Sequence, residues 1–338
     1  MKKILFGLGD HISENTAPGS RPLRIGEVLE KNGFVVKFFS LDNIRKNNSP
    51  QKTNLLDNLY SNYKLAREIA IYASENKVQV ISRGIYLNIF LALFSFRYNF
   101  QFGVEFHCKV ESNTLEWLFQ RKYLHVLLFG TLGVFSTLQS NFIIGITPAI
   151  CSYNKRMFGK KTFLIPNGIE VRKIKKIINP NYKSKILEGR VNYIFFIGHQ
   201  EPWVPLEDIL NLSEINDNVK VVIIGESPRY LNYSKRYTKA IFLGKLKYEE
   251  VMNLANNYAF CFYHPYLDHD IWNYKSSRKI LEYMFFGKPI IINTDKFLDS
   301  DMKNSASFYK YNYGQIKSFS SLIDSLVSSE ISFINIGS

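Results

Sequence analysis

The sequence has few cysteines and no long uninterrupted hydrophobic segment. Its three cysteines, Cys108, Cys151 and Cys261, form no CxxC pair and have no histidine at metal-ligand spacing. This pattern argues against a disulfide framework and a structural zinc site, and it indicates a reducing compartment. The longest apolar stretch, residues 123–135, is well short of the roughly 20 residues that a membrane-spanning helix needs. We interpret it as a buried helix, with a shallow contact to a membrane surface as the alternative.

Acidic residues are scarce relative to basic ones. The chain has 43 Lys and Arg against 29 Asp and Glu, a net charge of +14, and the first half is the more basic. Such a surface suits an anionic membrane, a phosphate-bearing acceptor or nucleic acid, or it serves solubility alone. No nucleic-acid-binding motif accompanies the charge, so we expect no nucleic-acid partner. From Met1 to Leu5 the chain runs from two lysines into a short apolar strand that is too brief for a signal peptide. This predicts a cytoplasmic protein whose membrane contact, if any, is peripheral at the inner face.

Length and patterning predict the architecture. A chain of 338 residues with 46% hydrophobic content exceeds what one compact core usually organises. Strand-like and helix-like segments alternate in both halves, as in parallel sheets wound with helices. The predicted fold class is therefore α/β, with two Rossmann-like doubly wound domains facing a cleft. We expect an N-terminal domain over residues 1–170, a linker over 171–190, a C-terminal domain over 191–315, and a final helix and tail over 316–338.

Hydrophobic periodicity and turn residues locate the elements. In the first half we expect strands over residues 3–8, 34–39, 78–81, 102–106, 142–146 and 163–169, and helices over 55–75 and 87–96. In the second half we expect strands over 193–197, 219–224, 240–243, 259–263 and 289–292, and helices over 206–212, 248–256 and 277–286. A last helix is expected to run to Val327, with Ser320 as its cap.

The strongest motif is the segment SSRKILEYMFFGKPII, residues 276–291. Two serines at a helix start leave backbone N–H groups and the positive end of the helix dipole available to a diphosphate. Arg278 and Lys279 add positive charge to that site. Glu282 lies three residues beyond Lys279, on nearly the same helix face. The alternative interpretation is an exposed Lys/Glu pair on an amphipathic helix.

A second motif, LIPNGIE at residues 164–170, contains the tight turn Pro166-Asn167-Gly168. These two motifs resemble the donor-binding segment and the turn that closes the first domain in GT-B glycosyltransferases, in particular the large retaining family that includes sucrose and mannosyl transferases. The resemblance implies an acceptor-side first domain and a nucleotide-sugar-binding second domain. It implies an enzyme that moves a sugar, with retention, from a nucleotide-diphosphate donor to a saccharide or polyprenyl-linked saccharide acceptor in cell-surface polysaccharide or glycan synthesis.

The resemblance also implies site residues. His107, at the end of strand 102–106, would lie in the interdomain crevice as a catalytic residue that positions the sugar. Arg278 and Lys279 would stabilise the leaving group, and Glu282 would accept both hydroxyls of the ribose. The other donor-binding candidates are helix-start and loop residues, namely Ser276, Ser277, Gly198, His199, Gly225, Gly244, Lys245 and Leu246. The acceptor-side candidates are Gly9, Asp10 and Arg21.

Departures from the family pattern keep alternatives open. Relatives often have a glutamate eight positions before the ribose glutamate, where this chain has Tyr274, and Asp268 and Asp270 are candidates to replace it. The loop after strand 193–197 lacks the arginine and lysine that grip the diphosphate in relatives. The alternatives are a nucleotide-sugar 2-epimerase of the same architecture and a non-catalytic GT-B glycan-binding module. With Ile12 in place of a third glycine, GxGxxG is absent, which weakens a dehydrogenase interpretation. No DxD-like dyad is evident, so we expect no metal and no cofactor besides the nucleotide sugar.

Overall fold

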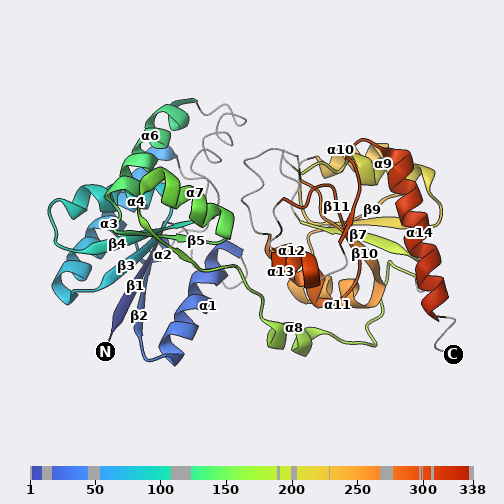
Figure 1. Ribbon diagram of the computed structural model, residues 1–338, viewed down its shortest axis with the longest axis horizontal. Helices are drawn as coiled ribbons and strands as arrows, with labels where there is room; N and C mark the ends of the chain where they lie inside the picture. Colours follow the sequence, from blue (N-terminus) through green and yellow to red (C-terminus); the bar gives the residue numbers. More distant parts are fainter. Residues whose placement is uncertain are drawn as a thin grey trace. The chain divides into compact units, whose positions relative to one another are not determined.

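The computed structural model describes residues 2–9, 17–44, 54–107, 123–188, 191–198, 204–227, 229–266, 277–296, 298, 300–305 and 308–334. The chain divides between Asn167 and Gly168 into two compact units. Each unit is a parallel six-stranded sheet with helices on both faces (Figure 1). The predicted α/β class with two doubly wound domains is confirmed.

Unit 1 has the strand order β2-β1-β3-β4-β5-β6. Its strands are β1 (Lys3–Leu8), β2 (Val35–Ser40), β3 (Gln79–Arg83), β4 (Gln101–Phe106), β5 (Phe142–Gly145) and β6 (Lys161–Leu164). Its helices are α1 (Ala17–Lys31), α2 (Leu41–Ile44), α3 (Leu55–Asn76), α4 (Ile85–Ser95), α6 (Tyr123–Gln139) and α7 (Pro148–Phe158). Because every neighbouring pair is parallel, the carboxyl ends of the strands share one edge.

The core of unit 1 follows the two-residue period of its strands. On one face, Leu5 and Val80 pack against Ile69 of α3 and Leu87 of α4. On the other face, Phe6 stacks on Phe38 with ring centroids 5.3 Å apart. A Cβ on Gly26 of α1 would come within 2.4 Å of the Phe38 ring. Glycine at that position therefore lets α1 pack directly on β2.

Unit 2 has the strand order β12-β11-β10-β7-β8-β9. Its strands are β7 (Tyr193–Ile197), β8 (Lys220–Ile224), β9 (Ile241–Gly244), β10 (Ala259–Tyr263), β11 (Ile290–Ile292) and β12 (Phe308–Lys310). Its helices are α8 (Val171–Ile177), α9 (Glu207–Ile215), α10 (Tyr230–Arg236), α11 (Tyr248–Tyr258), α12 (Arg278–Phe285), α13 (Ser300–Ser305) and α14 (Ile316–Ile334). Figure 1 shows α9, α10 and α14 on one face of this sheet and α11 and α12 on the other.

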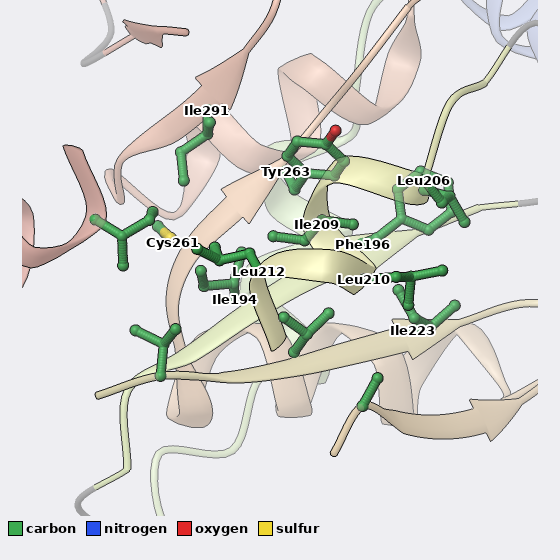
Figure 2. Close-up of a cluster of buried hydrophobic side chains, with 14 of the residues drawn as sticks. Ile194, Phe196, Leu206, Ile209, Leu210, Leu212, Ile223, Cys261, Tyr263 and Ile291 are labelled. Atoms are coloured by element: carbon green, nitrogen blue, oxygen red, sulfur yellow. The ribbon is translucent and has the colours of Figure 1, made fainter. Parts of the chain in front are cut away.

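Aliphatic side chains from β7, β8 and α9 form the core on the α9 face of unit 2. Figure 2 shows Ile194, Ile209 and Ile223 in this cluster, together with Cys261 and Tyr263 of β10. On the opposite face, Phe262 stacks on Tyr283 of α12, with ring centroids 4.2 Å apart and planes within 4° of parallel. Both rings are fully buried, so this stack anchors α12 over the centre of the sheet.

The segment expected as a linker, residues 171–190, contains helix α8. Ile174 of α8 is buried. Asn253 of α11 donates to the Ile177 carbonyl at 3.0 Å and accepts from the Asn179 backbone N–H at 2.6 Å. Backbone groups of this segment therefore pair with side chains of α11.

The start of the last helix and the segment after β5 differ from the sequence-based expectations. The last helix, α14, begins at Ile316, so Ser320 lies inside it, where its hydroxyl accepts a hydrogen bond from Asn216. Residues 147–158 were not predicted as a helix, although Thr147 caps α7 by accepting from the Ile150 N–H at 3.1 Å. A threonine followed by proline is a usual helix start, and that signal was available in the sequence.

Candidate functional site

The order of strands in unit 2 reverses at β7. The chain runs from β7 to β8 and β9 on one side, and then returns to β10 on the other side of β7. In doubly wound sheets, ligands bind beyond the carboxyl ends of the strands at this reversal. Gly198 follows β7 there and His264 follows β10, and helix α12, which connects β10 to β11, begins at the same edge. The topology therefore brings the predicted donor-binding segments to one edge of unit 2.

Glu282 is the best-defined residue of this edge. It is only 3% exposed. Its Oε1 accepts a 3.2 Å hydrogen bond from Tyr248 Oη and lies 3.5 Å from Arg278 Nε, while its Oε2 lies 3.5 Å from Lys279 Nζ. Within the described residues, Oε2 has no hydrogen-bond donor. Glu282 is therefore part of a buried charged cluster, and the alternative of an exposed Lys/Glu pair is wrong.

The start of α12 lies beside this cluster. Ser277 is the N-cap residue, and in the described chain its side chain does not cap the first turn. The N–H groups at the start of a helix have no acceptor within the helix, and they attract anions. Arg278 and Lys279 are the first two residues of α12, about one-third exposed, so both cations reach solvent near these N–H groups. Ser276, Asp268, Asp270 and Tyr274 lie outside the described residues.

His264 is a residue of this edge that the sequence did not reveal. Its ring is buried and meets the rings of Tyr266 and Tyr283 edge-on, with centroids 5.1 and 5.8 Å away. Burial, together with the nearby charge of Lys279, lowers the pKa of His264 to about 3. His264 is consequently neutral at physiological pH. A neutral imidazole does not repel the ammonium group of Lys279.

Three predicted glycines line the other side of the edge. The Gly198 N–H donates to the Ile224 carbonyl and the Gly225 N–H to the Gly244 carbonyl, each at 2.8 Å. Gly225 has a φ of 140°, and a Cβ there would lie 1.9 Å from the Gly198 oxygen. Only glycine permits this approach of the two loops.

Gly225 and Gly244 border a pocket of about 540 Å³ whose walls include Tyr230 and Phe242. Tyr230 also donates a 3.0 Å hydrogen bond to the Gly198 carbonyl. Lys245 forms an exposed 3.6 Å ion pair with Glu226, and Leu246 follows it half-buried. His199 lies outside the described residues. An open pocket with aromatic walls and glycine backbone suits a planar group.

In unit 1, Arg21, Glu105 and His107 meet at the carboxyl end of β4. Glu105 Oε1 accepts a 2.7 Å hydrogen bond from Arg21 Nε, and Oε2 lies 3.5 Å from His107 Nε2. Burial opposes ionisation of Glu105, but His107 and Arg21 together hold its pKa at about 2. For His107, burial lowers the pKa and Glu105 acts against that effect. Glu105 is thus a buried carboxylate that both side chains stabilise.

Arg21 also holds the end of unit 1. Its Nη1 donates to the Pro166 carbonyl at 2.8 Å and to Asn167 Oδ1 at 3.2 Å, and its Nη2 donates to the Ile165 carbonyl at 2.7 Å. All three guanidinium nitrogens therefore donate to groups of the chain itself. The predicted turn at residues 166–168 is tied to α1 and β4 by this one side chain.

The other acceptor-side candidates follow β1, at the point where the strand order of unit 1 reverses. The Gly9 N–H donates to the Arg83 carbonyl at 2.8 Å. A Cβ on Gly9 would lie 3.1 Å from Asn62 Oδ1 and 3.2 Å from the Arg83 oxygen. Glycine therefore allows the loop after β1 to pass close to β3 and α3. Asp10 lies outside the described residues.

Comparison with known proteins is informative at the level of structure. No protein-family model matches the chain, and no curated protein matches it. Sucrose-phosphate synthase from Thermosynechococcus elongatus superposes with a TM-score of 0.71 at 13% identity, covering 97% of this chain and 90% of that one. The chain has the GT-B fold. The lipopolysaccharide outer core galactosyltransferase WaaB (TM-score 0.61, 12% identity, 97% and 91% covered) shares it. Anabaena Alr3699/HepE in complex with UDP and glucose also shares it, with a TM-score of 0.61 at 15% identity, covering 97% of this chain and 90% of that one.

Proposed function

We propose that this GT-B protein is a glycosyltransferase that moves a sugar from a nucleotide-diphosphate donor to a saccharide or polyprenyl-linked saccharide acceptor. The observation that carries the proposal is Glu282. This carboxylate is buried, one of its oxygens has no hydrogen-bond donor among the described residues, and two cations adjoin it at the reversal of the sheet. A buried acceptor without a donor is costly, and the hydroxyls of a ribose would satisfy it.

The rest of the donor fits the surroundings of Glu282. A diphosphate would lie against the N–H groups at the start of α12, with Arg278 and Lys279 balancing its charge. The pocket beside Gly225 and Gly244 has aromatic walls suited to a base. The Alr3699/HepE structures contain UDP and UDP-glucose, which supports a nucleotide sugar as the donor of a protein with this fold.

The proposed reaction retains the anomeric configuration. The acceptor hydroxyl attacks the anomeric carbon on the face that the leaving phosphate vacates, the glycosyl–phosphate bond breaks, and the donor phosphate takes the hydroxyl proton. Arg278, Lys279 and the start of α12 stabilise the charge that develops on the diphosphate, and His107 orients the sugar. No metal takes part in this scheme, so transfer is expected to continue in the presence of EDTA.

Thermal unfolding in the presence of UDP-, GDP- and other nucleotide sugars tests the proposal, because a ligand of the folded state raises the melting temperature. Proton NMR of the stabilising nucleotide sugar then separates the candidate activities. Glycosyl transfer or slow hydrolysis is the expected result. Inversion at the sugar C2 without an acceptor would indicate an epimerase, and binding without turnover would indicate a glycan-binding module. Stabilisation by no nucleotide sugar would contradict the proposal.

A lipid-linked acceptor would place the reaction at the inner face of the cell membrane, in the synthesis of surface polysaccharide. No helix in the described part of the chain is long and apolar enough to cross a bilayer. Support for a peripheral contact comes from the exposed apolar residues Leu93 of α4, Phe96 just after that helix, and Leu138 of α6, together with the basic surplus of the first half. Co-sedimentation with phosphatidylglycerol vesicles is expected to fall in Leu138→Glu and not in Leu231→Glu, a matched exposed leucine of α10. Equal binding by both variants would contradict the membrane contact.

A further inference from the structure

We infer that Glu105 is a positioning residue that keeps the proton of neutral His107 on Nε2, so that Nδ1 offers a lone pair to a hydroxyl group of the substrate. The assignment of the proton concerns the protein alone. The identity of the bound group rests on the proposed function.

The geometry of β4 supports the role of Glu105. Glu105 and His107 are two residues apart along the direction of β4, which sends their side chains to the same side. Nε2 of His107 is buried and has no hydrogen-bond partner among the described residues, and the carboxylate oxygen Oε2 faces it at 3.5 Å. Arg21 holds the other carboxylate oxygen at 2.7 Å, so the carboxylate cannot turn away. A carboxylate only accepts hydrogen bonds, which favours the proton on Nε2.

The charges around His107 favour its neutral form. The charged groups that face it are Glu105 on its own strand, Arg21 on α1 and Arg83 on β3. Burial lowers the pKa of His107 most, Glu105 raises it, and the two arginines lower it. A neutral imidazole with Nε2 protonated has one acceptor nitrogen, Nδ1. That nitrogen accepts from a hydroxyl group and repels phosphate or carboxylate oxygens, so His107 recognises a sugar hydroxyl.

Nitrogen-15 NMR of histidine-labelled protein tests this assignment, because the two tautomers give different ring-nitrogen shifts. The His107 signal is identified among those of the six histidines by its loss in His107→Asn. The wild-type protein at pH 7 is expected to show the Nε2–H tautomer. An Nδ1–H tautomer in the wild-type protein overturns the inference, even if no variant of Glu105 folds.

Glu105→Gln provides a second and sharper measurement. Arg21 can only donate, so the amide oxygen of the glutamine stays with Arg21 and its NH₂ group turns toward His107. Nε2 must then accept, and the proton moves to Nδ1. The variant is expected to show this switch, whereas Glu27→Gln, which removes an exposed carboxylate of α1 paired with Arg24, keeps the wild-type tautomer. An unchanged tautomer in Glu105→Gln contradicts the inference.

Activity separates this inference from the proposed function. Glu105→Gln is expected to lower kcat about 10- to 100-fold, the range found for groups that orient metal-bound histidines, with unchanged affinity for UDP. If the wild-type protein transfers no sugar and Glu105→Gln still switches the tautomer, the positioning role of Glu105 stands and the proposed transferase activity is refuted. Transfer at the wild-type rate by Glu105→Gln with a switched tautomer would refute the recognition of a hydroxyl by Nδ1.

Discussion

Tyr248, the first residue of α11, donates a 3.2 Å hydrogen bond to Oε1 of Glu282 on α12. This bond holds one oxygen of a buried carboxylate and leaves the other without a hydrogen-bond donor in the described chain. Tyr248 itself is 37% exposed, so its ring reaches the surface beside the carboxylate that it holds. The hydrogen bond therefore links the start of α11, which follows the loop at residues 244–247, to the helix that carries the predicted diphosphate site.

Replacing Glu282 by alanine is expected to weaken the binding of the nucleotide. A hydrogen bond to a charged group contributes roughly 1.5–3 kcal/mol, so the dissociation constant for UDP should rise about 10- to 150-fold. Isothermal titration calorimetry measures the change, and circular dichroism checks the fold. Glu249→Ala is the control, since Glu249 is an exposed carboxylate next to Tyr248 on α11. Equal dissociation constants for UDP in the two variants would show that Glu282 does not contribute to nucleotide binding.

Replacing Tyr248 by phenylalanine keeps the ring and removes the hydroxyl that orients Glu282. Because the hydroxyl acts on UDP only through Glu282, a loss of about 1 kcal/mol is expected, which predicts a roughly fivefold weaker affinity for UDP. The same calorimetric titration measures it. Tyr60→Phe on α3, which removes the hydroxyl of another exposed tyrosine, should leave the affinity unchanged. An affinity for UDP in Tyr248→Phe as high as in the wild-type protein would show that this hydrogen bond plays no part in binding.

Arg21→Ala is expected to destabilise unit 1. The substitution leaves Glu105, whose side chain is 3% exposed, without its 2.7 Å partner, and it frees the carbonyls of Ile165 and Pro166. Breaking a buried ion pair from one side costs about 3–5 kcal/mol. Urea denaturation measures the loss.

Arg24→Ala is the control for this experiment, because Arg24 pairs with the half-exposed Glu27 of the same helix. Its loss should cost less than about 1 kcal/mol. Similar free energies of unfolding in the two variants would mean that the Arg21 cluster contributes no more than a surface ion pair.

His264 predicts that stability falls in mild acid. Its pKa is about 3 in the folded protein and 6.5 in the unfolded chain, so only the unfolded chain takes up a proton between these values. The free energy of unfolding is therefore unaffected by this group above pH 6.5, and it falls progressively as the pH drops toward 3. Between pH 7 and pH 5 this group alone should lower the free energy of unfolding by about 2 kcal/mol.

His264→Phe keeps a ring between Tyr266 and Tyr283 and removes the titrating group. Urea denaturation at pH 7 and pH 5 should show a smaller loss of stability in this variant than in the wild-type protein. The same pH dependence in both proteins would show that His264 does not remain neutral in the folded state.

Gly225→Ala is expected to cost roughly 3 kcal/mol or more, because the new Cβ would lie 1.9 Å from the Gly198 oxygen at a φ of 140°. Gly244→Ala is a matched comparison. Gly244 also has a positive φ, 66°, but nothing lies within 4 Å of a Cβ there, so only the backbone penalty of about 1 kcal/mol applies. Thermal unfolding distinguishes the two variants, and equal melting temperatures would indicate that the loops after β7 and β8 separate easily.

Local periodicity was enough to predict most of the elements that carry the site. The residues at 278, 279 and 282 meet because spacings of three and four bring side chains together on any α-helix, whatever the surrounding fold. Glu105 and His107 share a side of β4 for a similar reason, although the sequence alone indicated no role for Glu105. The Thr-Pro pair at the start of α7 is a local signal for a helix. The contacts of the segment around α8 are not local, because their partners on α11 lie more than 70 residues away.

The sequence by itself thus determined the alternation of strands and helices, and with it the α/β class and the charged face of α12. Tertiary structure alone decided that Glu282 is buried under Tyr248, that His264 lies near Lys279, and that Arg21 joins Glu105 to residues 165–167. Side-chain direction within an element follows from its own backbone period. Contacts between residues 34 or 84 positions apart depend instead on which strands become neighbours and where the strand order reverses.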